Sequence, residues 1–258
     1  MKEVTQETRR AIDTDSLAQI DISEKGRSEE GKPISLDRRL FMQFMAFGNC
    51  HQPEAVIDKL TANSAKAVLY QDVNDPLGIG LLSYCEDPAY LVNEIQPLFL
   101  LGELRDLVIK HEYTMLGRTY SIGYESDLED VLIDRPIQRI CNPETPWAVW
   151  YPLRRHGSFE RQSKEDQRKM LMEHGGIGIA YGKSDLAVDI RLSGHGLNKE
   201  DHDFIIGLLG KDLFPLSALV QHMRRTRQTS EFIQNMGPFF IGRSIWQTNQ
   251  QLKVVADD

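Results

Sequence analysis

The chain has 258 residues, of which 41% are hydrophobic and 26% charged, a length and composition that support a substantial core and exclude a wholly disordered, collagen-like or coiled-coil protein. A net charge of −8 argues against a nucleic-acid-binding surface, and no apolar run approaches the roughly 20 residues that span a bilayer. Three cysteines without a C-x-x-C pair favour neither a disulfide scaffold nor a zinc site, so we expect a soluble, reduced, cytoplasmic protein with no nucleic-acid partner and no membrane insertion.

The first half of the chain predicts one ferredoxin-like unit after a polar segment. Residues 1–36 are charge-rich and predict a flexible N-terminal arm, or alternatively a strap onto a neighbouring subunit. The apolar pattern then predicts strands over 40–47, 66–70 and 79–84 and helices over 53–60 and 87–99. The order β-α-β-β-α is that of a ferredoxin-like unit. We therefore assign residues 37–146 to an N-terminal half, in which 103–146 form the connection to the next.

The second half of the chain repeats this order. Strands are predicted over 147–153, 177–181, 186–193, 202–209 and 238–241, and helices over 163–173 and 212–228. Ser163 is the expected N-cap of the first of these helices, and Gly175 is its expected stop. Residues 147–246 therefore form a C-terminal half, which is followed by a polar tail over 247–258.

A short internal repeat supports two equivalent halves. Ile79-Gly80-Leu81-Leu82 recurs as Ile206-Gly207-Leu208-Leu209, and Leu91-Val92 of the next helix recurs as Leu219-Val220. Both pairs fall at the same place in the two units, and a repeat carries meaning when the repeating element is a supersecondary unit. The predicted fold class is α+β, with two ferredoxin-like halves that form a dimeric α+β barrel within one chain.

Common catalytic motifs are missing, but three segments could carry chemistry. The sequence has no H-E-x-x-H, no G-x-S-x-G, no Walker-A loop and no G-x-G-x-x-G after a strand. The first segment, Trp150-Tyr151-Pro152-Leu153-Arg154-Arg155, is a strand end with paired guanidinium groups, which bind planar carboxylates in a bidentate manner. A buried aromatic strand followed by a solvated basic turn is the alternative interpretation.

The other two segments place a histidine and a polar strand face in the C-terminal half. His174 is predicted at a helix end, either as an axial metal or haem ligand or as a helix C-cap. In the strand over 186–193, Asp189, Arg191 and Ser193 share one face. That face either lines a pocket or lies in water, because burying polar side chains without partners is costly.

Together these segments resemble the chlorite dismutase family of haem proteins. Four ordered elements carry the match: Trp150 to Arg155, Leu171-Met172-Glu173-His174-Gly175-Gly176-Ile177-Gly178, Gly196-Leu197-Asn198 and Gly237-Pro238-Phe239-Phe240-Ile241-Gly242. The resemblance implies a barrel of two ferredoxin-like halves that assembles into a homo-oligomer, with a pentamer as the expected number. It also implies an iron porphyrin, haem b or coproheme, as the cofactor.

The resemblance assigns roles to individual residues. His174 would be the proximal ligand of the haem iron. Arg154 or Arg155 would hold a porphyrin propionate. Tyr151 would contact the cofactor, and it would match the tyrosine that carries radical chemistry in the family's coproheme decarboxylases.

The distal residue decides activity in this family, and it lies on the polar strand face. The family's usual spacing from His174 places the distal residue at Ala187, whereas the spacing from the Gly196-Leu197 turn places it at Asp189. The two positions differ by a two-residue insertion, which keeps strand parity, so both lie on one face of the strand with Arg191. A carboxylate beside an arginine can move a proton and polarise a bound peroxide. We therefore expect a peroxide-dependent oxidoreductase, either a coproheme decarboxylase or a peroxidase-like enzyme. The alternatives are chlorite decomposition to chloride and oxygen, which requires Arg191, and a non-catalytic haem carrier or sensor.

Overall fold

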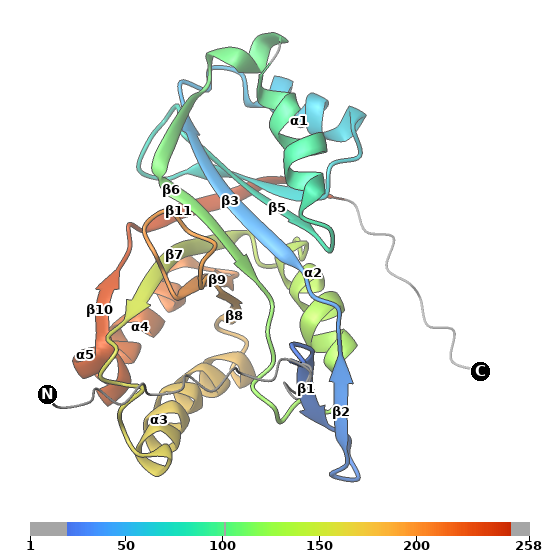
Figure 1. Ribbon diagram of the computed structural model, residues 1–258. Coiled ribbons are helices and arrows are strands. Elements are labelled where there is room, and N and C mark those ends of the chain that lie inside the picture. The colour runs from blue at the N-terminus through green and yellow to red at the C-terminus, as the bar shows by residue number, and fades with distance from the viewer. Residues whose placement is uncertain (1–19, 101, 249–258) are drawn as a thin grey trace, which may run out of the picture.

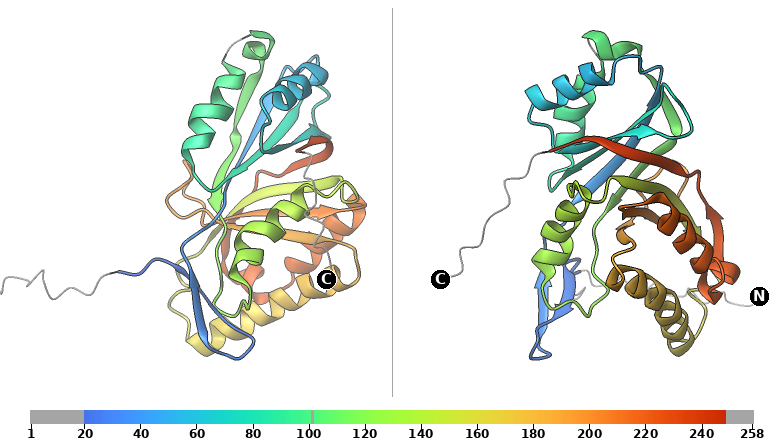
Figure 2. Two further views of the ribbon diagram at one scale, coloured as in Figure 1. Left: turned by 90° about the vertical axis from the view of Figure 1, so that its right-hand side faces the viewer. Right: turned by 180° about the vertical axis from the view of Figure 1, so that it is seen from behind.

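The computed structural model describes residues 20–100 and 102–248. Nine strands form one sheet in the order β10-β7-β11-β4-β5-β3-β6-β8-β9, and a further pairing of β9 with β7 closes eight of them into a barrel. The helices lie outside the barrel, with α1 on the first half and α3, α4 and α5 on the second (Figures 1 and 2).

The elements follow the chain in two successive sets. The first set is β3 (Phe41–Gly48), α1 (Pro53–Ala62), β4 (Ala67–Asp72), β5 (Ile79–Cys85), η2 (Leu91–Ile95), η3 (Gln96–Phe99), η4 (Gly102–Asp106) and β6 (Val108–Arg118). A connection then holds η5 (Asp130–Asp134) and α2 (Arg135–Ile140). The second set is β7 (Trp147–Arg155), α3 (Lys164–Lys183), β8 (Val188–Ser193), β9 (Phe204–Gly210), α4 (Leu213–Met223), α5 (Arg227–Phe232), β10 (Ile233–Met236) and β11 (Phe240–Gln247).

Both sets have the ferredoxin-like strand order. The first half runs β4-β5-β3-β6 across the sheet, and the second runs β8-β9-β7-β11, which is the same order of second, third, first and fourth strand. The halves join at two seams, where β11 pairs with β4 and β6 pairs with β8. The predicted fold of two ferredoxin-like halves in one barrel is confirmed.

The repeated tetrapeptide occupies equivalent strands, and its glycine faces the barrel interior in both. Gly80 lies on β5 and Gly207 on β9, the third strand of each half. A Cβ at Gly80 would lie 2.5 Å from Cζ of Phe44, and one at Gly207 would collide with the ring of Trp150. These rings belong to an aromatic cluster in the interior, in which Phe44 stacks on Trp150 at 5.9 Å between ring centroids. The repeat therefore exists because glycine leaves room for interior aromatic rings.

The predicted connection over 103–146 contains a strand of the barrel, for which the sequence suggests at most a connecting strand over 112–118. Strand β6 supplies the fourth strand of the first half and pairs with β3 along most of its length. Its first residues, up to Glu112, are mostly exposed, so the apolar alternation that identifies a strand is weak there.

The helices of the second half differ from the predicted ones. Helix α3 begins at its Ser163 cap as expected but continues to Lys183, so the stop at Gly175 and the strand over 177–181 are wrong. Glycine costs only about 1 kcal/mol inside a helix, and here it does not end one. The predicted helix over 212–228 is two helices, because Thr226 begins α5 with its own side-chain cap. Among the described residues, no helix is long and apolar enough to cross a membrane.

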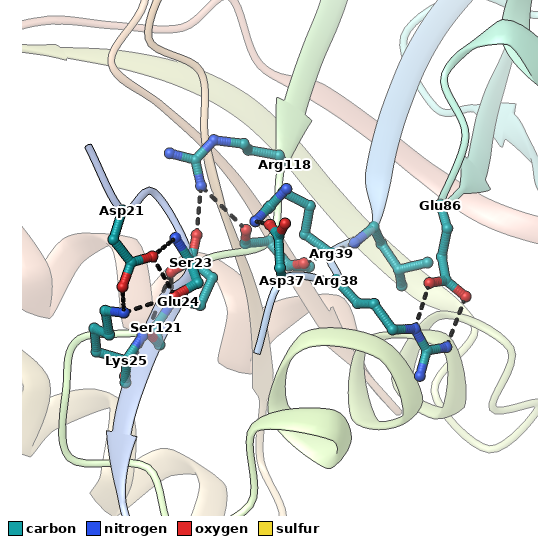
Figure 3. Close-up of polar contacts among 12 residues, drawn as sticks. Asp21, Ser23, Glu24, Lys25, Asp37, Arg38, Arg39, Glu86, Arg118 and Ser121 are labelled. Atoms are coloured by element: carbon teal, nitrogen blue, oxygen red, sulfur yellow. Dashed lines mark hydrogen bonds and ion pairs between the residues drawn. The ribbon is translucent and has the colours of Figure 1, made fainter. Parts of the chain in front are cut away.

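Part of the predicted flexible arm is an ordered hairpin. Strands β1 (Glu24–Arg27) and β2 (Pro33–Leu36) pair with each other beside the connection that follows β6. Figure 3 shows the Glu24 carboxylate between Arg118 and Ser121: it accepts from Arg118 Nη1 at 2.8 Å and from the Ser121 backbone N–H at 2.9 Å. Residues 1–19 of the predicted arm, and nearly all of the predicted tail, lie outside the described residues.

Candidate functional site

The candidate site lies on the outer face of the C-terminal half of the barrel. Strands β8, β9 and β7 lie side by side there, and the helices α3 and α4 cover them (Figure 1). The register places Arg191, Ile206 and Tyr151 in one row across the three strands. Because residues directly opposite in neighbouring strands point to the same side of a sheet, this row faces the helices together.

Some apolar residues of this sheet face are only partly buried. Ile206 and Phe204 stay partly exposed, although β9 has a neighbouring strand on both sides. Helix α3 has 20 residues, yet its buried residues are Gln167 and Met170. A Cβ at Gly175 would meet nothing within 4 Å. A partly exposed apolar face beside a helix with few buried side chains is packed less completely than a core.

His174 lies in the middle of α3, not at a helix end as predicted, and it is half-buried. Its Nδ1 atom lies 3.2 Å from Oγ1 of Thr226 and 3.4 Å from Oγ1 of Thr229. Burial lowers the pKa of His174, and the positive charges of Arg155 and Arg191 lower it further. The neutral imidazole, which is the form that binds metals, is therefore favoured.

Asp189 and Arg191 form an ion pair on the sheet, at 3.1 Å between Arg191 Nε and Asp189 Oδ2. A second arginine, Arg139 of α2, donates to the Asp189 carbonyl at 2.6 Å and lies 3.4 Å from its Oδ1. Both carboxylate oxygens of Asp189 are thus engaged by guanidinium groups. Sequence reasoning missed Arg139 because it lies in the connection, about fifty residues before its partner, and no local pattern links them. Ala187, the other distal candidate, is buried just before β8.

Tyr151 lies on the helix-facing side of β7 and is buried. Its ring stacks on Phe239 with 4.4 Å between centroids. Burial raises the pKa of the Tyr151 hydroxyl, and the nearby Asp189 carboxylate raises it further. The phenol therefore stays protonated at neutral pH.

The structure separates the two candidate arginines of β7. Arg155 shares the helix-facing side with Tyr151, and its guanidinium lies over the rings of Phe159 at 4.3 Å and Phe204 at 4.8 Å. Arg154 has the opposite strand parity and pairs with Asp201 at 2.8 Å. Alternation along a strand sends neighbouring side chains to opposite faces, so only Arg155 points toward the row that contains Tyr151.

One site residue, Tyr120, was not expected from the sequence. It follows β6, its ring lies 6.0 Å from that of Phe204, and burial raises its pKa although Arg191 and Arg155 act against the shift. It also lines a cavity of about 60 Å³ with Arg139, Asp189 and Arg191. Tyr120 is recognised only from its position in the folded chain, because it lies outside every sequence motif of the second half.

These residues fit a flat, apolar prosthetic group that carries carboxylates. In the described residues, no group of three or more His, Cys, Asp or Glu side chains could hold a metal ion. The Arg155 Nε is buried without a hydrogen-bond partner among the described residues, and an unpaired buried guanidinium nitrogen is costly. A carboxylate of such a group would satisfy it.

The fold and the site together define a class: a barrel of two ferredoxin-like halves with one histidine on the long helix of the second half. The model of the family described as chlorite dismutase matches residues 108–245, which is more than half of the chain. The protein therefore belongs to the chlorite dismutase family.

Two solved structures illustrate the likeness. The chlorite dismutase from Candidatus Nitrospira defluvii in complex with imidazole superposes with a TM-score of 0.62 at 14% identity, covering 81% of this chain and 92% of the other. A structure described as a novel heme-binding protein from Thermus thermophilus gives 0.61 at 16% identity, with the same shares of each chain. At these identities the likeness concerns the fold. No curated protein matches the sequence.

Proposed function

We propose that this protein binds an iron porphyrin, haem b or coproheme, between α3 and the C-terminal sheet, and uses it with peroxide as an oxidoreductase. The observation that supports this most is the convergence of three groups around one open apolar floor. They are a half-buried neutral histidine, an ion-paired carboxylate and arginine on the facing strand, and a buried arginine nitrogen without a partner among the described residues.

Each residue has a role in this proposal. His174 holds the iron from the helix side, and Arg155 binds a propionate with its free Nε. Asp189 and Arg191 act on the sheet side, where Asp189 accepts a proton from the oxidant and Arg191 stabilises the negative charge that remains. The bound iron porphyrin supplies the redox chemistry, and Tyr151 lies in the same row as Arg191, with Ile206 between them.

An optical titration of the apoprotein with haem, and separately with iron coproporphyrin III, tests the proposal. We expect a saturable Soret shift with one porphyrin per chain. The variant His174→Ala should lose this shift. His222→Ala is the matched control, because His222 is exposed on α4 and bonds Tyr181 rather than the site. Unchanged axial ligation in His174→Ala would refute the assignment of the ligand.

Addition of peroxide then separates the two activities. A mass loss of two carboxyl groups from bound coproheme identifies a coproheme decarboxylase. Oxidation of an added donor with the porphyrin left intact identifies a peroxidase-like enzyme. Chlorite decomposition is disfavoured because the Arg191 guanidinium is paired with Asp189. A flat oxygen-electrode trace with chlorite is the expected result, and oxygen release would restore that alternative.

A non-catalytic haem carrier or sensor is the second candidate. Both oxygens of Asp189 are already held by Arg139 and Arg191, so a proton from an oxidant could reach the carboxylate only if one of these contacts opened. Complete transfer of haem to an apo-acceptor protein, without turnover on peroxide, would favour this candidate over the enzyme.

We also propose a cytoplasmic homo-oligomer, with a pentamer as the expected number. Leu171, Met172 and Ile179 are exposed on α3, and an oligomer interface over this helix would bury them. Light scattering on the purified protein measures the oligomer number directly. A monomer at micromolar concentration would contradict the proposal.

A further inference from the structure

Thr226 has an unusual set of hydrogen bonds for a helix cap. It begins α5, and its Oγ1 accepts from the Thr229 backbone N–H in the ordinary manner of an N-cap. Its Oγ1 lies 2.8 Å from the carbonyl oxygen of Met223 and 3.3 Å from Oγ1 of Thr229, so the much shorter contact, to Met223, takes the hydroxyl proton. A carbonyl oxygen can only accept, so Thr226 must be the donor in that bond.

This commitment decides the tautomer of His174. Thr226 has one proton, and it goes to Met223, so toward His174 Nδ1 at 3.2 Å the hydroxyl can only accept. A proton on Nδ1 of the histidine satisfies this closer contact, and it leaves the lone pair on Nε2. The contact between His174 Nδ1 and Thr229 Oγ1 is longer, at 3.4 Å, so Thr226 is the main partner.

The carboxylate nearest in sequence does not compete for this nitrogen. Glu173 Oε2 accepts from the backbone N–H of Arg227 at 3.2 Å, and this bond ties α3 to the first turn of α5. The Nδ1 atom of the histidine is thus bonded to a neutral, buried hydroxyl rather than to a charged group.

We propose that Thr226 is a positioning residue that fixes the Nδ1–H tautomer of His174, so that Nε2 offers its lone pair to a ligand. The inference rests on the proposed function, because it concerns the ligand that His174 offers to iron. A hydroxyl acceptor draws the imidazole proton less strongly than a carboxylate does, so the ligand donates less charge to the metal. The reduced state of a bound iron is therefore stabilised relative to the oxidised state.

The tautomer is measured first, on the protein without porphyrin. Two-bond ¹H–¹⁵N correlation spectra distinguish the two neutral forms of an imidazole. We expect His174 to carry its proton on Nδ1 in the wild type and in Thr226→Ser. In Thr226→Val, which has a similar volume and no hydroxyl, the preference should be lost. A wild-type histidine protonated on Nε2, or an unchanged tautomer in Thr226→Val, would overturn the inference.

The second measurement uses the porphyrin-loaded protein and the variant Thr226→Asp. Aspartate is also a good N-cap, so α5 keeps its start while a carboxylate replaces the hydroxyl. At a fixed potential the ferrous-to-ferric ratio should fall at least about tenfold, which is about 59 mV for a one-electron couple. Thr226→Ser should match the wild type. Equal potentials in the wild type and Thr226→Asp would refute the inference.

The two proposals can fail separately. If neither porphyrin binds the wild-type chain, the proposed function fails, and the tautomer measurement still decides the role of Thr226. If a porphyrin binds but the tautomer or the potential is insensitive to Thr226, the proposed function stands and this inference fails.

Discussion

The outer faces of the two half-barrels have the same strand order but are filled in different ways. In the N-terminal half, Ile79 and Leu81 of the third strand are 0% exposed, and they pack with Val56 and Leu60 of α1. In the C-terminal half, the residue equivalent to Ile79 is Ile206, which is partly exposed, and Arg191 lies beside it on the next strand. The outer face of the N-terminal half is therefore buried under its helix, whereas that of the C-terminal half is only partly covered.

The helices account for much of this difference. Helix α1 has ten residues and presents Val56 and Leu60 to its sheet. Helix α3 has twenty residues, but its middle contains His174 and the glycines around it. Small residues on a helix leave space against the facing sheet, whereas branched apolar residues fill it. The outer face of the second unit is therefore less filled than that of the first, as the proposed porphyrin site requires, while the barrel interior is packed in both.

Truncation of the equivalent isoleucines should give the largest contrast. Ile79→Ala removes a fully buried side chain, so we expect the free energy of unfolding to fall by about 2–5 kcal/mol. Ile206→Ala removes a partly exposed one, and we expect a loss of about 1 kcal/mol. Urea unfolding of the apoprotein measures both. Equal losses would show that the C-terminal face is as well packed as the N-terminal one.

Porphyrin binding should then stabilise one face and not the other. At a free porphyrin concentration of about 100 times Kd, the free energy of unfolding should rise by about 2.7 kcal/mol. Hydrogen exchange should slow in α3 between His174 and Lys183, where few side chains are buried, and stay unchanged in α1. Equal protection of both helices would contradict a ligand confined to the C-terminal half.

The two arginines of β7 provide a smaller and more local test. Arg155→Gln should weaken porphyrin binding about tenfold, or about 1.4 kcal/mol, because it removes the buried Nε that has no hydrogen-bond partner among the described residues. Arg154→Gln is the control, since Arg154 pairs with Asp201 on the other side of the strand. Porphyrin titrations of both variants measure the two affinities. An equal loss of affinity in each variant would mean that strand parity does not select the arginine that binds the propionate.

The smallest effect is expected at the hairpin. Glu24→Gln weakens the ion pair with Arg118, the β6 residue that pairs with β8 at one seam. The Arg118 side chain is 37% exposed, so the loss of unfolding free energy should be about 0.2–1 kcal/mol. Thermal unfolding of the variant checks this, with Glu30→Gln as a control in an exposed pair of the same hairpin. A loss comparable with that of Ile79→Ala would mean that the hairpin holds the seam together.

The sequence could predict those parts of the molecule that depend on local periodicity or on short repeats. The Ile-Gly-Leu-Leu repeat correctly placed β5 and β9 as equivalent strands, and parity within β8 correctly put Asp189 and Arg191 on one face. The predicted end of α3 at Gly175 is wrong, because a glycine is tolerated inside a helix whose cap and last turn are well formed.

The unpredicted site residues share one property: each reaches the site from a distant part of the chain. Tyr120 and Arg139 lie in the connection, and Thr226 lies at a helix start that was hidden inside one long predicted helix. Their contacts with Asp189 and His174 are tertiary. Neither residue spacing nor strand parity contains information about such pairs, so only the folded chain reveals them.

The two seams of the barrel have a consequence for how the chain could be divided. Each half alone would expose two unpaired edge strands, β4 and β6 in the first and β8 and β11 in the second, and such edges seek partners. A break in the loop between α2 and β7 would give two fragments whose edges match each other. When the two fragments are co-expressed, they should assemble into one barrel. Recovery of the Soret absorption of the proposed porphyrin complex would then show that the two fragments have met.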